Sequence, residues 1–280
     1  MKKFLKATNT QFILEWYYPK KGKSKSKGAN KGKERREIKS LNINEQNFKG
    51  SLVFDESWTE LKEINCSLNQ LTSLDVSRLP KLERLFCHYN QLTKLKLSEN
   101  LTKLSCSHNL LTSVEFLNKL SNENKEKLTH LDISDNSIRR EEDGNVFSPQ
   151  SLDFLSGFTN LRYLSLGNWD EEVTAYNNFT GSLEPLRNLK NLKKLDISST
   201  DIDKGLENLS DNLNTEDIIC LTDKWPTSKV RKIQQQLTNK KSQSNDETTK
   251  KVEELNKKIT QLEEKISKLK LENQTQIPPK

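Results

Sequence analysis

A leucine-spaced pattern recurs through the middle of the chain and constrains its fold more than any other feature. It can be written L-x-x-L-x-L-x-x-N-x-L, with Ile or Cys at some of the leucine positions. Four clear copies begin at Leu61, Leu82, Leu101 and Leu128, which are 21, 19 and 27 residues apart. A unit of this length cannot bury its own apolar face, so the pattern predicts a solenoid of stacked coils.

The spacing within one copy predicts the path of each coil. The segment L-x-x-L-x-L reads as a short strand whose alternate side chains point in opposite directions. The Leu, Ile and Cys side chains then point into the stack, and the residues between them face an open, concave side. The asparagine comes where the backbone must turn beside the core, and its amide can satisfy buried peptide groups. Stacked coils should therefore carry a ladder of asparagines.

The other side of each coil should be short. Three copies continue after the asparagine with a second apolar triplet, which predicts a β-like outer side with little room for a helix. Before Leu152, the sequence Ser148-Pro149-Gln150 predicts a capped helix on the outer face. Segment 167–176 interrupts one copy, and the turn reappears at Asn177. The ladder position is occupied by different residues in the first, interrupted and last copies: Gln46, Trp169 and Thr200.

Three of the four cysteines share one position in the repeat. Cys66, Cys87 and Cys106 fall at the same inward place of successive copies, where a small apolar residue fits. A metal site, the alternative, needs close pairs such as C-x-x-C, and the sequence has none. We therefore predict reduced cysteines in the core.

Positive charge is concentrated in one short segment. The formal net charge is +7, and residues 20–36 hold nine Lys or Arg and one Glu, which gives +8 there and −1 elsewhere. Such a self-repelling run predicts a disordered loop. It is typical of a solvated insertion, and alternatively of a segment that binds nucleic acid, anionic lipid or an import receptor. The repeat region itself is not a basic nucleic-acid-binding domain.

An apolar and aromatic cluster precedes this basic segment. Phe12, Ile13, Leu14 and Trp16 suit a short helix that ends before Pro19. Because a solenoid has an open apolar end, we interpret residues 1–19 as an N-terminal cap, with an exposed peptide motif as the alternative. The chain begins without the apolar core of a signal peptide, and no stretch is apolar enough to span a bilayer. We expect a cytoplasmic protein, with the nucleus as the alternative compartment.

The repeats resemble a known family. Residues 69–76 (NQLTSLDV) and 90–95 (NQLTKL) resemble the short leucine-rich repeats common in bacterial and fungal proteins. Residues 179–206 are similar to an expanded group of fungal leucine-rich repeat proteins. The resemblance covers about residues 38–215. It implies an α/β leucine-rich repeat solenoid, with a curved parallel sheet inside and an irregular or short β and helical outer side, and it implies protein–protein interaction.

The end of the chain predicts a coiled coil. Val or Ile occupies every a position and Leu every d position in the series Val252, Leu255, Ile259, Leu262, Ile266 and Leu269. That choice favours a parallel homodimer, which should be weak because the segment is short. The alternative is a single helix that folds back on the solenoid.

The chain thus divides into five segments. They are a cap over 1–19, a basic disordered loop over 20–37, a leucine-rich repeat domain over 38–222, a helix and flexible linker over 223–250, and a coiled coil over 251–273. Within the fourth segment we expect the polar residues 238–250 to be the flexible linker.

The register of the strands identifies a candidate binding surface. One group of outward residues and their neighbours is rich in arginine, aromatic rings and imidazole: Arg84, Phe86, His88, Tyr89 and His108. Arginine and aromatic side chains are enriched in binding hot spots, and a phenylalanine facing water suggests a partner. We hypothesise that this patch is the centre of a protein-binding site, the alternative being scattered surface side chains.

No catalytic, cofactor or metal site is predicted. The chain lacks the motifs G-x-G-x-x-G, H-R-D, D-F-G, H-E-x-x-H and G-x-S-x-G. His88 and His108 would supply only two of the four ligands of a firm zinc site. The sequence predicts a non-enzymatic intracellular scaffold that binds a protein partner on its concave face. The alternative is a regulator at nucleic acid or an anionic membrane that uses residues 20–36.

Overall fold

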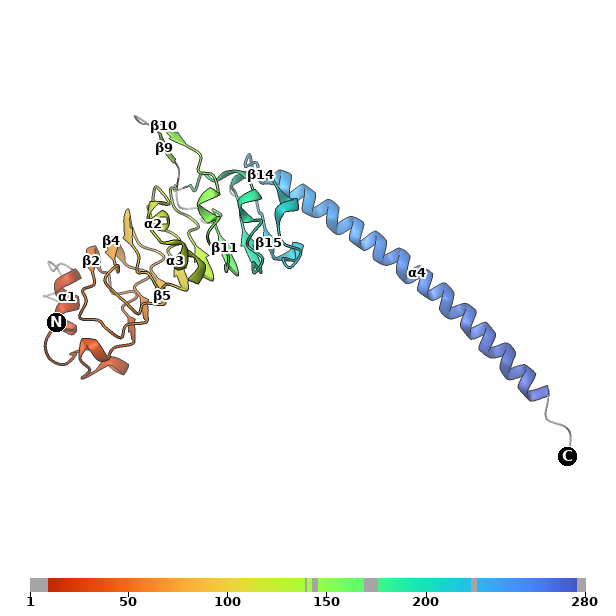
Figure 1. Cartoon of the computed structure of the whole chain (residues 1–280), viewed down its shortest axis with the longest axis horizontal. Helices are drawn as coiled ribbons and strands as arrows, with labels where there is room; N and C mark the ends of the chain where they lie inside the picture. The colour runs from red at the N-terminus through yellow and green to blue at the C-terminus, as the bar shows by residue number, and fades with distance from the viewer. Residues whose placement is uncertain (1–9, 139, 143–145, 169–175, 223–225, 276–280) are drawn as a thin grey trace. The chain divides into compact units, whose positions relative to one another are not determined.

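The repeats stack into a solenoid whose inner side is a parallel sheet (Figure 1). The computed structural model describes residues 10–138, 140–142, 146–168, 176–222 and 226–275. Within them the inner sheet has eight strands in chain order, which confirms the predicted architecture. The strands are β1 (Ser40–Asn42), β3 (Glu63–Asn65), β5 (Arg84–Phe86), β7 (Lys103–Ser105), β8 (His130–Asp132), β11 (Tyr163–Ser165), β13 (Lys194–Asp196) and β15 (Ile218–Ile219).

The core is a column of side chains from successive coils. The middle residue of each three-residue strand points inward, and Leu85 pairs in register with Ile64 on one side and Leu104 on the other. Two residues after these come Cys66, Cys87 and Cys106, which are wholly buried free thiols on consecutive coils. Burial raises the pKa of Cys66 to about 12 and that of Cys87 and Cys106 well above the usual value. The predicted core position of these cysteines is confirmed.

The asparagine ladder joins each coil to the one before it. Asn90 donates to the carbonyls of Cys66, at 3.0 Å, and Cys87, at 3.1 Å, and its Oδ1 accepts from the Leu71 amide at 2.9 Å. The other rungs repeat this pattern: Asn69, Asn109 and Asn136. The side chain therefore satisfies peptide groups of two coils at once, as the sequence predicts.

The ladder continues past the interruption through a different residue. Asn177 donates to the carbonyls of Ile133 and Leu166 and accepts from the Ile138 amide. Asn168 braces this rung from the start of the interruption, because its Oδ1 accepts from the Asn177 amide at 2.8 Å. Trp169, expected at the rung by position, lies outside the described residues.

The outer side varies from coil to coil. Three early coils form a parallel sheet of β2 (Lys49–Val53), β4 (Gln70–Asp75) and β6 (Lys94–Lys96). The 27-residue coil adds two short helices, α2 (Glu115–Asn118) and α3 (Asn122–Lys127). Later come β9 (Arg140–Glu142) paired with β10 (Val146–Ser148), and β12 (Thr180–Ser182) paired with β14 (Asp201–Lys204). The outer side is thus short and mixed.

One outer helix was predicted wrongly. The segment after Pro149 forms only a 3₁₀ turn, η4 (Asp153–Leu155), in place of the expected capped α-helix. The chain must reach the buried Leu161, just before β11, six residues later, which leaves no length for several helical turns. Similar 3₁₀ turns occupy η5 (Glu184–Leu186) and η6 (Leu206–Asn208).

The basic segment is ordered, so the prediction of a disordered loop over 20–37 is wrong. It contains the 3₁₀ turns η2 (Gly28–Asn30) and η3 (Arg35–Glu37). Arg35 is buried, donates to the Tyr18 carbonyl and pairs with Asp55 at 3.3 Å. These contacts fix both ends of the segment, which composition alone does not reveal.

The C-terminal part is a single helix, α4 (Arg231–Thr275). The predicted flexible linker over 238–250 is wrong, because the helix runs through it without a break; residues 223–225 lie outside the description. No Gly or Pro occurs between Arg231 and Thr275, so the polar sequence can continue the helix. None of the helices in the described ranges combines the length and apolarity needed to cross a bilayer.

Candidate functional site

The concave side of the inner sheet presents two rows of side chains. They arise because the first and third residues of each strand point away from the core while the middle one points inward. The first row is Ser40, Glu63, Arg84, Lys103, His130, Tyr163 and Lys194. The second row is Asn42, Asn65, Phe86, Ser105, Asp132, Ser165 and Asp196.

The structure distributes the five predicted residues over two neighbouring coils. Arg84 and Phe86 lie in the first and second rows of β5, His88 and Tyr89 follow that strand, and His108 follows β7. Arg84 is occupied by ion pairs, at 2.6 Å from Glu63 and 3.9 Å from Glu83. Its charge is therefore locally neutralised, which the sequence did not reveal.

Three of the predicted residues form a cluster of rings. Tyr89 stacks on His108, with ring centroids 4.0 Å apart, and His88 meets Tyr89 edge-on at 5.9 Å. Tyr89 is 46% exposed, so one face of this cluster is open to solvent. The half-buried Phe86 precedes His88 by two residues on the same side of the strand. We call Phe86, His88, Tyr89 and His108 the ring patch.

The backbone beneath this cluster is left-handed. Tyr89 and His108 have φ of 52° and 51°, and Leu68, at the same place one coil earlier, has φ of 56°. Each precedes a ladder asparagine, so the sharp turn of the coil requires this conformation. A residue other than glycine pays roughly 1–2 kcal/mol for it, and Asn or Asp tolerates it best. The exposed ring of Tyr89 is therefore an unfavourable choice for stability at its turn, whereas histidine is among the residues that adopt this conformation more often.

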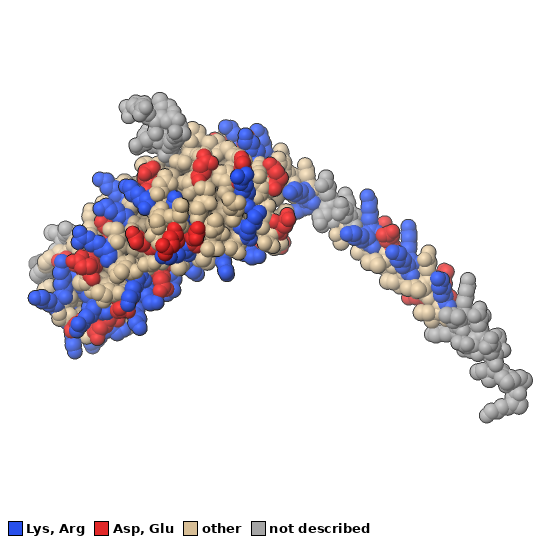
Figure 2. All heavy atoms as spheres, viewed as in Figure 1, with Lys and Arg blue, Asp and Glu red and all other residues tan. Residues whose placement is uncertain are grey.

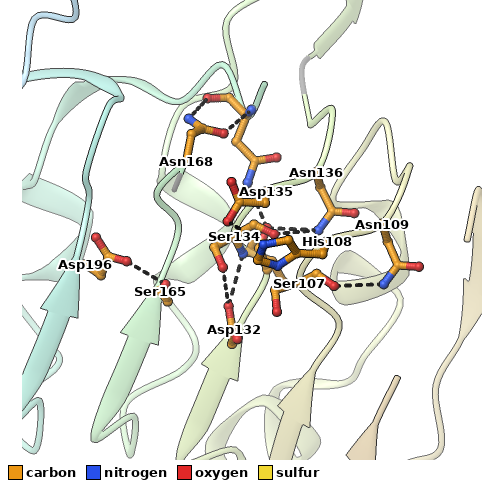
Figure 3. Close-up of polar contacts among 12 residues, drawn as sticks. Ser107, His108, Asn109, Asp132, Ser134, Asp135, Asn136, Ser165, Asn168 and Asp196 are labelled. Carbon is orange, nitrogen blue, oxygen red and sulfur yellow. Dashed lines mark hydrogen bonds and ion pairs between the residues drawn. The ribbon is translucent and has the colours of Figure 1, made fainter. Parts of the chain in front are cut away.

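Acidic residues that sequence reasoning left out of the site lie next to the rings. His108 Nε2 is 3.5 Å from Oδ2 of the fully buried Asp135. Asp132 accepts hydrogen bonds from the amide and hydroxyl of Ser134 (Figure 3). It also accepts one from the hydroxyl of Ser105. A signal was present, because an Asn or Asp followed two residues later by Ser recurs at 65, 132 and 196.

Two imidazoles of the concave side, those of His88 and His130, are favoured in their neutral form. Burial lowers the pKa of His88, and neighbouring Asp132 offsets part of this effect. Burial also lowers the pKa of His130, and the positive charges of Lys103 and Arg162 lower it further. His130 stacks on Tyr163 in the first row, with centroids 6.2 Å apart. The face therefore offers ring surfaces, and His88 and His130 offer neutral hydrogen-bonding nitrogens at neutral pH.

The coil length, the parallel inner sheet and the asparagine ladder together define one architecture. The chain has the leucine-rich repeat fold. Solved structures similar to it include a TDR receptor, with 20% identity and a TM-score of 0.44 over 60% of this chain. A leucine-rich repeat protein of Leptospira interrogans has 20% identity and a TM-score of 0.41 over 62% of the chain. Internalin C2 of Listeria monocytogenes has 16% identity and a TM-score of 0.42 over 70% of the chain.

The compared proteins differ in size from this one. The chain covers 27% of the receptor and 47% of the Leptospira protein, less than half of each, but 87% of the internalin. No protein-family model and no curated protein sequence matches the chain.

The ring patch differs from a small-molecule or metal site. Among the described residues, no group of three or more His, Cys, Asp and Glu side chains could hold a metal ion. A pocket of about 430 Å³ lies elsewhere, lined by polar side chains that include Glu126, Lys127 and Arg162, and it contains none of the five predicted residues.

Proposed function

We propose that the chain is a non-enzymatic interaction scaffold whose concave side binds a protein partner at the ring patch. The observation that carries this proposal is the ring of Tyr89, which stacks on His108 and is exposed on a turn where a large ring is unfavourable for stability. Four buried free cysteines fit a reducing compartment, the cytoplasm or the nucleus.

The chemistry of the patch favours a partner segment with apolar side chains. Rings supply large contact area at low conformational cost, and neutral imidazoles add directed hydrogen bonds. Leu68, 45% exposed on the preceding coil, extends the apolar surface beside Tyr89. Arg84 belongs to the proposed site as a rim residue, because its pairing with Glu63 limits what its charge can add.

A displayed peptide library, selected on the full chain, would test this function. Peptides that bind the intact chain should lose at least about 30-fold in affinity for the variant Phe86→Ala/Tyr89→Ala, as expected when a hot spot worth about 2 kcal/mol is removed. Phe12→Ala, which removes another exposed ring, is the control and should leave affinity unchanged. Selected peptides that bind both variants equally well would contradict the proposal.

We also propose that α4 pairs with the same helix of a second copy in parallel. Its stripe of Val252, Leu255, Ile259, Leu262 and Ile266 is exposed in the single chain. Lys258 at a g position would meet Glu263 at an e position of the partner helix, which favours the parallel register. Two joined chains would present two ring patches, so a repetitive partner would be bound with higher avidity.

A further inference from the structure

The short N-terminal helix α1 (Thr10–Tyr17) is anchored to the solenoid by one face. The Thr10 hydroxyl both donates to the Lys49 carbonyl and accepts from the Lys49 amide, each at 2.6 Å. The Val53 amide donates to Gln11, and Leu14 is buried. Tyr18 then packs against the buried Trp58, with ring centroids 5.6 Å apart. The end of the solenoid is therefore covered by Leu14, Tyr18 and Trp58.

The opposite face of α1 leaves large rings in solvent. Phe12 is 53% exposed and Trp16 56% exposed, and they lie one helical turn apart on the same face. Tyr17 beside them is also exposed. Since other residues already cover the solenoid, these rings have no role in the cap. An exposed group of this kind marks an interaction surface.

The ordered basic segment lies against these rings. The Lys25 amide donates to the Tyr17 carbonyl at 2.8 Å, and the Lys25 ammonium lies 3.8 Å above the Trp16 ring. Backbone hydrogen bonds join Ser24 to Gly32 and Lys33, which brings the second half of the segment alongside the first. The fold thus holds lysines from the whole basic segment near α1, which the composition of the segment does not reveal.

Most of these lysines are not neutralised. Lys20 and Arg35 pair with Asp55, and Arg36 pairs with Glu34. The remaining cations are exposed and form no ion pair with another described residue: Lys21, Lys23, Lys25, Lys27, Lys31 and Lys33. Elsewhere on the solenoid acidic and basic side chains intermingle (Figure 2), and pairs such as Lys62 with Glu83 are common. This end of the molecule therefore carries an excess of positive charge beside exposed rings.

We infer that Phe12, Trp16, Tyr17 and these six lysines form a docking surface for an anionic lipid bilayer. This inference goes beyond the proposed function, which concerns the ring patch. Tryptophan and its aromatic neighbours enter the boundary between headgroups and acyl chains, where an apolar ring meets a polar layer. The lysines lie at the anionic headgroups, and their flexible stems let the charges reach water and phosphate. The rings and the charges each strengthen the binding of the other.

A nucleic acid fits this surface less well. Bases bind to such proteins by stacking on open ring faces, and one face of Trp16 is already occupied by the Lys25 ammonium. The cations are all lysines, because Arg35 is buried and Arg36 is paired, so the forked contacts of arginine to phosphate are absent from this set. Insertion of ring edges into a bilayer needs neither feature.

Vesicle binding by the full chain would test the surface. The probes are vesicles of phosphatidylcholine alone and of phosphatidylcholine mixed with phosphatidylserine, measured by co-sedimentation. We expect binding only to the anionic vesicles. Phe12→Ala/Trp16→Ala should weaken it at least about tenfold, since each ring contributes through buried apolar area. Lys21→Gln/Lys23→Gln/Lys27→Gln should weaken it roughly 100-fold, since each lysine near the surface contributes about fivefold.

Matched controls separate this surface from general charge. Lys190→Gln/Lys193→Gln/Lys194→Gln lowers the net charge by the same amount, from +7 to +4, and should keep vesicle binding. Tyr89→Ala removes an exposed ring of the ring patch and should also keep it. Tryptophan fluorescence gives a second measurement: lipids brominated near the headgroup should quench the fluorescence of the intact chain, and the conservative change Trp16→Phe should remove that quenching.

Three outcomes would overturn the inference. They are equal binding to neutral vesicles, equal losses in the two triple-lysine variants, and tight binding of single-stranded RNA that is insensitive to Phe12→Ala/Trp16→Ala while anionic vesicles stay unbound. The peptide measurement on Phe86→Ala/Tyr89→Ala tests only the ring patch, and the vesicle measurement tests only the surface of α1 and the basic segment. Either proposal can therefore fail without affecting the other.

Discussion

The solenoid and the C-terminal helix both carry regular patterns of leucine and isoleucine, and they treat these side chains in opposite ways. In the coils, inward residues such as Ile64, Leu85 and Leu131 have no exposed surface. In α4, the residues of the apolar stripe are 50–57% exposed. Each coil finds its neighbour in the same chain, whereas a single helix has none. The coil pattern is therefore complete within one chain, and in our proposal the helix pattern is completed by a second copy of the chain.

The largest expected effect comes from removing a rung of the ladder. Asn90→Ala leaves the Leu71 amide without its acceptor and removes one of two amide donors from each of the Cys66 and Cys87 carbonyls. A buried unsatisfied group costs about 1–3 kcal/mol, and each lost hydrogen bond about 1 kcal/mol. We expect a loss of roughly 3–5 kcal/mol in the free energy of unfolding, measured by urea denaturation. Gln91→Ala, at the exposed next residue, should change it by less than about 0.5 kcal/mol. Similar losses in both variants would show that the ladder does not hold the coils together.

The next effect should fall on assembly alone. Ile259→Lys places a charge in the proposed helix pair and removes two isoleucines from it, each worth about 1.5–3 kcal/mol when buried. Sedimentation equilibrium should show a dimer for the intact chain in the micromolar range and a monomer for the variant. Gln261→Lys adds the same charge on the outer side of the helix and should keep the dimer. A strictly monomeric intact chain would remove the helix pair, and a lower unfolding midpoint of the solenoid in Ile259→Lys would contradict the separation of the two regions.

Alkaline pH should lower the free energy of unfolding, because three thiols are buried in the core of the coils. Folding raises the pKa of Cys66, Cys87 and Cys106, so the folded state keeps protons that the unfolded state loses above about pH 8.5. Their contribution is complete below that pH and is lost as pH rises toward the folded pKa, which is about 12 for Cys66. The slope should be about 1.4 kcal/mol per pH unit for each thiol. Urea midpoints at pH 8 and 10 would measure it, and a flat profile in Cys66→Ala/Cys87→Ala/Cys106→Ala is the control. An intact chain as insensitive as that variant would disprove the effect.

The smallest expected effect is a gain in stability at Leu68, an apolar residue that is exposed on the surface of the solenoid. Leu68→Asn should stabilise the chain by up to about 1 kcal/mol, because asparagine tolerates the left-handed turn better than leucine. Leu110→Asn is the matched control, since Leu110 is similarly exposed without a positive φ. Thermal melts of the two variants would compare them. Equal shifts would mean that exposure rather than backbone conformation determines the result.

The inner side was predictable because its rules are local and repeated. Leucine spacing gave the inward column, and the asparagine position gave the hydrogen bonds between coils. The return of the turn at Asn177 was also predicted, but its place in the ladder was not, because counting along the repeat put Trp169 at that position. Each coil requires an apolar residue at the inward positions and a polar one at the turn, so a pattern seen in several copies is a reliable prediction.

Features that occur once in the chain were predicted poorly. Order in the basic segment depends on Arg35, whose buried contacts with Tyr18 and Asp55 join parts distant in sequence. The composition of the segment indicates repulsion between its lysines, but it contains no information on those contacts of Arg35. The supposed linker over 238–250 is polar yet contains no helix breaker, and polarity alone does not end a helix. The helix expected after Pro149 failed because the distance to the next strand limits the outer side.

The candidate site was predictable in outline. The spacing placed Phe86 and His88 toward the concave side and located Tyr89 and His108 beside them. It did not reveal the stacking of those two rings, which depends on the left-handed turn before each rung. It also missed the buried Asp135 next to His108, because an acid so close to the core is not expected from its charge.

The inner strands lie in the sheet in the order in which they occur in the chain, and this order has a consequence for folding. Every strand touches only the strands about one coil earlier and one coil later, so no part of the sheet must wait for a distant segment of the polypeptide. Folding can nucleate in the regular central coils and grow outward in both directions, as expected for a nearly one-dimensional array. A chain emerging from the ribosome could thus add coils one by one, each new one finding its template already in place.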